Sequence, residues 1–207
     1  MLNFFKKIKK VTKLNRGMTY VELIVVLSIF SVMSSIILFN YSKFQAKVDI
    51  KNLANDIALK IVQAQKDAMS GILPSQTPSV NLWKPSYGVY FNLNDDKSFI
   101  YFTDLDQNQD YNISSLCPSN IDECIDKINI TKGNKISKIE SYLSSTPLQT
   151  ISPLAITFTR PNSGAFFTDS SGIPLTGFDY VQITVSSSDN SVNGYIKIYP
   201  SGRIQVN

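Results

Sequence analysis

A long apolar segment near the N-terminus constrains this chain more than any other feature of its sequence. From Met18 to Tyr41 the only charged residue is Glu22. As an α-helix, this segment would extend about 36 Å at 1.5 Å per residue, which is enough to cross a hydrocarbon core about 30 Å thick. We therefore expect residues 18–41 to form a membrane-spanning helix.

The segment before this helix is basic. Residues 1–17 contain six Lys and Arg residues and no acid, and positive charge beside an apolar segment holds that flank in the cytoplasm. An ordinary secretory signal is cut after its apolar region, whereas the boundary Arg16-Gly17 precedes it here. Cleavage at this boundary would remove a basic leader, residues 1–17, and leave the apolar helix on the mature chain.

Several residues around this boundary resemble the processing signal of type IV prepilins and type II secretion pseudopilins: Arg16-Gly17, Thr19, Glu22 and the run Leu23-Ile24-Val25-Val26-Leu27. In that family, a membrane peptidase cuts after the glycine and methylates the new N-terminal amine. The resemblance implies cleavage between Gly17 and Met18 and methylation of Met18. It implies three kinds of partner: other pilin or pseudopilin subunits, the prepilin peptidase and an inner-membrane assembly platform.

Glu22 is the unusual residue of the apolar segment. A carboxylate in lipid needs a partner and is a functional hypothesis by default, and no Lys or Arg lies within reach on the same helix face. Cleavage would create a partner, the α-amine of Met18 of a neighbouring subunit, and the resemblance implies that this pairing sets the axial register of the filament. The alternative is that Glu22 lies in the headgroup zone and pairs with nothing.

Composition argues against an enzyme. The chain has no histidine, which removes the commonest general base and every Ser-His or Cys-His nucleophile arrangement. Without the leader, 14 Lys and Arg residues face 16 Asp and Glu residues, so the formal net charge falls from +4 to about −2. The basic pI therefore belongs to the leader and does not indicate nucleic-acid binding.

Apolar residues continue at helical spacing beyond the membrane segment, at Phe44, Val48, Leu53, Ile57, Ile61, Ala64 and Ala68. We predict an amphipathic continuation of the helix over residues 42–71, which ends near Ser70-Gly71.

Residues 72–207 are predicted to form a β-rich globular head. Short β-rich runs occur at 87–92, 98–103, 125–131, 136–141, 154–159, 165–168, 180–186, 195–199 and 203–206, with turn clusters such as Asn162-Ser163-Gly164 between them. The expected fold class is α+β, with an antiparallel sheet packed on the long helix. This layout resembles the pseudopilin H and minor-pilin branch of the family. The resemblance implies a single-pass protein of the cytoplasmic membrane with its head outside, which then enters an extracytoplasmic pilus or pseudopilus.

An acidic segment of the head alternates oxygen-bearing side chains, at Asp104, Asp106, Asn108 and Asp110. Such alternation lets a curled loop direct several oxygens at one Ca²⁺ ion. The match to a helix-loop-helix calcium site is incomplete, because Gln109 stands at the glycine position and Ser115 at the glutamate position. The missing carboxylate would come from Asp122, Glu123 or Asp126. The alternative is a solvated acidic turn without a metal.

The two cysteines, Cys117 and Cys124, have six residues between them. An exported head meets oxidising conditions, which favours a local disulfide. Free cysteines are the alternative, and two thiols without histidine make a poor metal site.

Lys197 and Arg203 would present a small basic face on the last two strands. In one branch of minor pilins a C-terminal Gly-Arg-x-Arg segment contributes to DNA binding, but this chain has Gly202-Arg203-Ile204-Gln205. Because DNA affinity needs several phosphate contacts, a structural role is favoured. The sequence thus predicts a minor pilin or pseudopilin, with a DNA-binding minor pilin and a non-polymerising, signal-anchored surface protein as alternatives.

Overall fold

A computed structural model of the chain describes residues 17–207 except 77, 79–82, 114–116, 120 and 170. The chain divides into two compact units, Met1–Lys43 and Phe44–Asn207. The leader predicted over residues 1–17 lies outside the described residues apart from Gly17.

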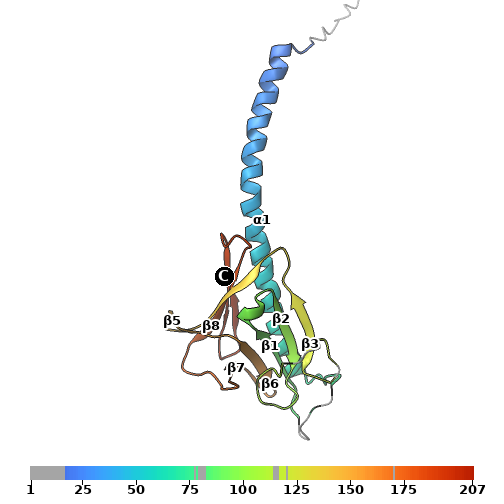
Figure 1. Ribbon diagram of the computed structural model, residues 1–207, viewed down its shortest axis with the longest axis vertical. Helices are drawn as coiled ribbons and strands as arrows, with labels where there is room; N and C mark the ends of the chain where they lie inside the picture. The colour runs from blue at the N-terminus through green and yellow to red at the C-terminus, as the bar shows by residue number, and fades with distance from the viewer. Residues whose placement is uncertain (1–16, 77, 79–82, 114–116, 120, 170) are drawn as a thin grey trace, which may run out of the picture. The chain divides into compact units, whose positions relative to one another are not determined.

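One helix, α1 (Tyr20–Ser70), belongs to both units and unites the two helical segments predicted from the sequence (Figure 1). Thr19 caps its start, because the Thr19 Oγ1 accepts a hydrogen bond from the Glu22 N–H at 3.2 Å. At the other end, Gly71 has a φ of 71°, which glycine adopts without strain. The N–H groups of Gly71 and Ile72 donate to the carbonyl oxygens of Ala68 and Asp67, which closes the helix as a Schellman motif.

The part of α1 in the first unit exposes its apolar side chains on all faces. Phe30 and Ile37, for example, are 68% and 66% exposed. The helix is long and apolar enough to cross a membrane by length and composition. These exposed side chains need a cover that the chain itself does not supply in its described residues.

The part of α1 in the second unit buries one stripe of small and β-branched residues: Ile50, Ala54, Ile57, Ala58, Ile61, Ala64 and Ala68. Phe44 was predicted to share this stripe, but it is 64% exposed. The buried stripe begins one to two turns further on, because the head first meets the helix near Ile50. There Gly194 of β9 lies so close that a Cβ on it would be 2.9 Å from the Ile50 side chain.

The head contains two five-stranded antiparallel sheets, where one sheet had been predicted. The first has the order β3-β2-β1-β6-β7, from β1 (Ser86–Phe91), β2 (Ser98–Thr103), β3 (Cys124–Asn129), β6 (Leu154–Thr159) and β7 (Asn162–Asp169). The second has the order β10-β9-β8-β4-β5, from β4 (Lys135–Leu143), β5 (Thr146–Thr150), β8 (Tyr180–Ser186), β9 (Asn193–Ile198) and β10 (Ile204–Val206). A short 3₁₀ helix, η1 (Leu93–Asp95), joins β1 to β2. The predicted α+β class is confirmed.

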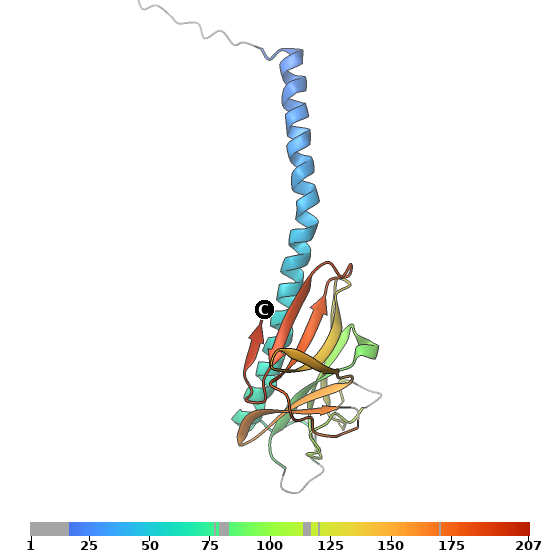
Figure 2. The same ribbon diagram turned by 90° about the vertical axis from the view of Figure 1, so that its left-hand side faces the viewer.

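The C-terminal half of α1 lies beside the strands of the head (Figures 1 and 2). One hydrophobic core joins this half of the helix to both sheets. Phe91 and Phe158 enter it from the first sheet, and Ile139, Ile183 and Ile196 enter it from the second. The other face of the first sheet carries a smaller cluster, in which Tyr111 packs on Tyr90 and Phe102 at ring-centroid distances of 4.9 and 5.2 Å. Tyr111 follows the acidic segment, so this packing fixes one end of the acidic loop on the sheet.

Two details of the strand prediction were wrong. β5 was not predicted, because it pairs at the edge of its sheet and every one of its residues is exposed, so no apolar alternation marks it. Asn162-Ser163-Gly164 was predicted as a turn but begins β7. The turn instead falls at Arg160-Pro161, immediately before that strand.

Candidate functional sites

The first candidate site is the start of α1. Gly17 and Met18 precede the helix and are exposed, and a Cβ added to Gly17 would meet no atom within 4 Å. Within the described residues the Glu22 carboxylate has neither an ion-pair nor a hydrogen-bond partner. The structure thus places an accessible peptide bond and an unpaired acid within the same short segment.

Sequence reasoning missed a second role for Glu22. Thr19-Tyr20-Val21-Glu22 has the spacing of a capping box, in which a Ser or Thr caps the helix and a Glu or Gln three residues later can reach back to the backbone. The structure shows the Thr19 half of this motif. The negative charge of Glu22 also lies where the helix dipole is positive.

The second candidate site is an acidic cluster at the end of β2. In the antiparallel pair of β2 and β3, Phe102 lies opposite Cys124. The residues that follow β2 therefore lie beside the residue that precedes β3, and the Thr103 N–H donates to the Glu123 carbonyl oxygen at 3.0 Å. This register brings Glu123 against the loop that starts at Asp104.

Three carboxylates meet there. Asp104, Asp106 and Glu123 each offer an oxygen, and these oxygens all lie within 4.8 Å of one another. Asp104 and Glu123 are buried and Asp106 is half-buried. Oxygens that bind one Ca²⁺ ion at about 2.3–2.6 Å are at most about 5 Å apart. The three residues are therefore close enough to hold one metal ion.

The electrostatics of the cluster are unbalanced. Burial raises the pKa of Asp104 to about 6 and that of Glu123 to about 7. Backbone N–H groups partly oppose this effect: Gln109 donates to Asp104, and Asn112 and Leu105 donate to Glu123. No Lys or Arg among the described residues forms an ion pair with Asp104, Asp106 or Glu123. The cluster thus gathers negative charge without a positive side chain to balance it.

The other two residues of the predicted alternation lie on the same loop but outside the cluster. The Asn108 Nδ2 donates to the Asp106 Oδ2 at 3.1 Å, so Asn108 orients a member of the cluster. The Asp110 Oδ1 accepts from the Tyr111 N–H at 2.8 Å. Burial is the main cause that raises the pKa of Asp110, and the negative charge of Asp169 raises it further.

Of the three carboxylates considered for completing the set, the structure brings only Glu123 into the cluster. Asp122 accepts a hydrogen bond from the Ser119 hydroxyl at 3.1 Å. Asp126 forms an ion pair with Lys60 of α1 at 3.7 Å. Ser115, at the glutamate position of the calcium-loop pattern, lies outside the described residues.

Gln109 shows why a glycine is not required at its position. It has a φ of 66°, in the left-handed region that glycine usually fills in a calcium loop. Its carbonyl oxygen accepts hydrogen bonds from the hydroxyls of Thr157 on β6 and Thr168 on β7. These two contacts hold the turn against the sheet, so the loop makes the turn without glycine.

A disulfide joins Cys117 to Cys124, whose Cα atoms are 5.4 Å apart. Cys124 is the residue after Glu123, and the Ser119 N–H donates to the Cys124 carbonyl oxygen at 3.0 Å. The cross-linked loop therefore adjoins the acidic cluster and restrains the backbone that carries Glu123.

The predicted basic pair stacks on tyrosines of its own sheet. The Lys197 Nζ lies 4.6 Å from the centre of the Tyr180 ring, and the Arg203 guanidinium lies 3.8 Å from that of Tyr199. Both cations thus have a partner within the head, which favours the structural role over a basic face for DNA.

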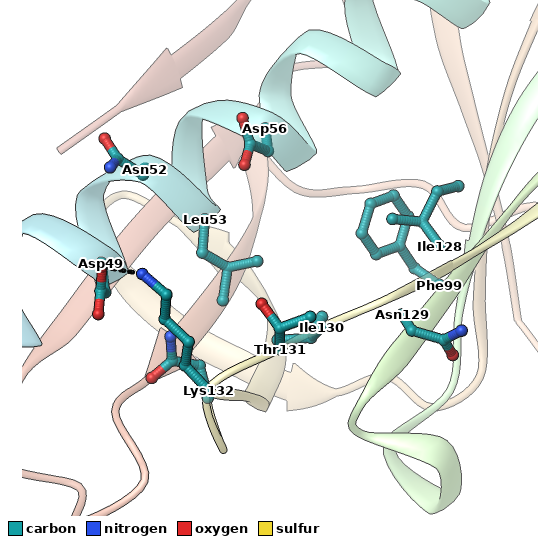
Figure 3. A pocket seen from close by; sticks show the side chains of 11 residues that line it. Asp49, Asn52, Leu53, Asp56, Phe99, Ile128, Asn129, Ile130, Thr131 and Lys132 are labelled. Carbon is teal, nitrogen blue, oxygen red and sulfur yellow. Dashed lines mark hydrogen bonds and ion pairs between the residues drawn. The ribbon is translucent and has the colours of Figure 1, made fainter.

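A further pocket of about 280 Å³ lies between α1 and a wall formed by β2, β3 and the residues that follow β3 (Figure 3). Across it, the Lys132 Nζ forms an ion pair with the Asp49 carboxylate at 2.7 Å. The hydrogen bond from Lys132 lowers the pKa of Asp49. This contact ties the β3–β4 connection to the helix and is best explained as packing.

Together, these features define a class: an α+β protein with a membrane-length N-terminal helix and a disulfide-bonded, antiparallel β head. No protein-family model, curated protein or solved structure matches the chain.

Proposed function

We propose that this chain is a prepilin-like precursor whose mature form is a minor pilin or pseudopilin, a structural subunit of a type IV pilus, type II secretion or related filament. One observation carries the proposal. An accessible Gly17-Met18 boundary immediately precedes an apolar helix whose first turn holds the unpaired Glu22.

The exposed helix supports assembly. Its apolar side chains are uncovered on all faces, and such a surface is stable only in lipid or against other apolar helices. A lone membrane anchor requires lipid alone. A pilin-type subunit uses both environments in turn, because it is first inserted in the membrane and then packed into a bundle of like helices.

Glu22 distinguishes these two uses. An ionised carboxylate within apolar surroundings is costly unless it is paired, and a simple anchor has no need of one. Cleavage after Gly17 would give Met18 a free α-amine, a positively charged group that can form an ion pair with a carboxylate. Pairing of Glu22 with the Met18 amine of a neighbouring subunit would offset the cost and fix the register between helices.

The test is intact-mass and N-terminal analysis of the chain after co-expression with a prepilin peptidase. We expect a chain that begins at Met18 and is about 14 Da heavier than the bare sequence because of one methyl group. Gly17→Val is the matched control and should stay uncut. Since a side chain at Gly17 meets nothing, this change alters the signal without disturbing the described structure.

The opposite result would be an uncut wild-type chain in cells where the same peptidase cleaves a control substrate. The chain would then be a signal-anchored surface protein that does not enter the pilin pathway.

A further inference from the structure

We propose that Asp104, Asp106 and Glu123 form a calcium-binding site in the head. This inference does not depend on the proposed assembly function, because it rests only on residues of the second unit. The three carboxylate oxygens lie within 4.8 Å of one another, so small side-chain movements suffice to bring all three to ordinary Ca²⁺–oxygen distances of about 2.3–2.6 Å from a single ion.

Asp104 gives an independent sign that the cluster takes a ligand. Its side chain is fully buried, and its Oδ1 has no hydrogen-bond partner within the described part of the chain. The other oxygen, Oδ2, accepts from the Ser86 hydroxyl and the Gln109 N–H. A buried carboxylate oxygen without a partner is unfavourable, and a cation that Asp104 binds together with Asp106 and Glu123 through this oxygen would satisfy it.

An amide group lies between the other two acids. The Asn112 Nδ2 donates to the Asp106 Oδ2 at 2.9 Å and lies 3.5 Å from the Glu123 Oε1. The amide of Asn108 also faces Asp106. Rotation of both amides by 180° would present oxygens in place of the two nitrogens. The side chains of the site would then offer carboxylate and amide oxygens, the ligand type that hard cations prefer.

The chemistry favours calcium over magnesium. Three carboxylates from two separate segments make an irregular set, and Ca²⁺ accepts such sets with six to eight oxygens, whereas Mg²⁺ demands a near-ideal octahedron. The site also has an entrance. A pocket of about 200 Å³ is lined by both Asp106 and Glu123, so an ion can reach the cluster from solvent and retain water ligands on that side.

A bound ion would join two separate segments of the connection between β2 and β3. Asp104 and Asp106 belong to the loop after β2, while Glu123 belongs to the disulfide-bonded loop before β3. The ion would cross-link these loops at the end of the first sheet where β2 stops and β3 starts. We therefore expect calcium to raise the thermal stability of the head, as any ligand specific to the folded state does.

The experiment is a calcium titration of the full chain in detergent micelles, followed by calorimetry and by the melting temperature in Ca²⁺, Mg²⁺ and chelator. We expect one ion per chain, a Kd of about 10⁻⁵–10⁻³ M and a higher Tm in Ca²⁺ than in Mg²⁺. Asp106→Asn and Glu123→Gln should each weaken binding about tenfold or more. Because Asp106 is half-buried, its amide variant should still fold.

Asp126→Asn is the matched control. It removes the same charge from the same region, but Asp126 is exposed and pairs with Lys60, so its calcium response should equal that of the wild type. Absence of binding at 10 mM Ca²⁺, roughly ten times the weakest expected Kd, would overturn the site. Wild-type binding by both Asp106→Asn and Glu123→Gln would also overturn it, and equal stabilisation by Mg²⁺ would overturn the assignment to calcium.

Discussion

Glu22 combines two physical roles at the start of α1, as a member of a capping-box sequence and as the single charge of an apolar segment. Both roles use the same carboxylate, but only one of them needs the charge. A capping box accepts either Glu or Gln at this position, whereas pairing with an α-ammonium group requires the ionised acid. The two roles can therefore be separated by substitution.

We predict that Glu22→Gln lowers assembly by at least about tenfold, because breaking an ion pair in apolar surroundings costs about 3–5 kcal/mol. Glu22→Asp keeps the charge and should retain more assembly. The measurement is the yield of cross-linked multimers of the processed chain in membranes, with cleavage at Gly17 checked in each variant. If Glu22→Gln assembles like the wild type, the acid serves the helix cap alone.

The acidic cluster shows how far single residues can be predicted. The alternation of oxygen side chains identified Asp104 and Asp106, and the need for one more carboxylate identified three alternatives that included Glu123. Choosing among these required the β2–β3 register, which places Glu123 beside Asp104 and turns Asp126 toward Lys60. Asn112 was missed, although it continues the alternation one step beyond Asp110, because the predicted segment ended at Asp110.

At the scale of elements, the periodicity of apolar residues predicted which helices and strands form better than it predicted which strands pair. The helical spacing of apolar residues gave α1 almost to its ends, and alternation gave nine of the ten strands. It did not indicate that β1 pairs with β6 or that β4 pairs with β8, because such pairings join strands far apart in the sequence. A single sheet was therefore predicted where two exist.

Adjacent positions of α1 give a direct test of its packing. Ile61 is fully buried in the core, while Val62 is 43% exposed. We predict that Ile61→Ala lowers the free energy of unfolding of the head by about 2–5 kcal/mol, through lost burial and a cavity. Val62→Ala should change it by about 0.5 kcal/mol or less.

Denaturant unfolding in detergent micelles can measure both variants through Trp83, the only tryptophan in the sequence. Its indole N–H donates to the Asp104 carbonyl oxygen at 2.7 Å, and its side chain packs against the core. Its fluorescence should therefore report loss of the head. Equal destabilisation by the two substitutions would show that α1 does not present the Ile61 face to the core.

At the scale of the whole molecule, charge is distributed unevenly along the sequence. The basic residues of segment 1–17 give the chain its net charge of +4, and the remainder is slightly acidic. Beside an apolar helix of membrane length, this asymmetry predicts one orientation, with the N-terminal flank in the cytoplasm and the head outside. The orientation matters for the head, because its disulfide persists only in an oxidising compartment.

Cys117 and Cys124 are the only cysteines in the sequence, so they can report the compartment of the head. We predict that in a Gram-negative host the wild-type cysteines do not react with a maleimide reagent when cells are denatured without reductant. Replacing the six Lys and Arg residues of segment 1–17 with Gln should weaken the orientation signal. A larger fraction of chains should then hold the head in the reducing cytoplasm and react. A control variant in which the five Lys residues of this segment become Arg and Arg16 becomes Lys keeps the charge and should behave like the wild type. Maleimide-reactive cysteines in the wild-type chain would place the head in the cytoplasm, and a head in that compartment could not belong to an extracytoplasmic filament.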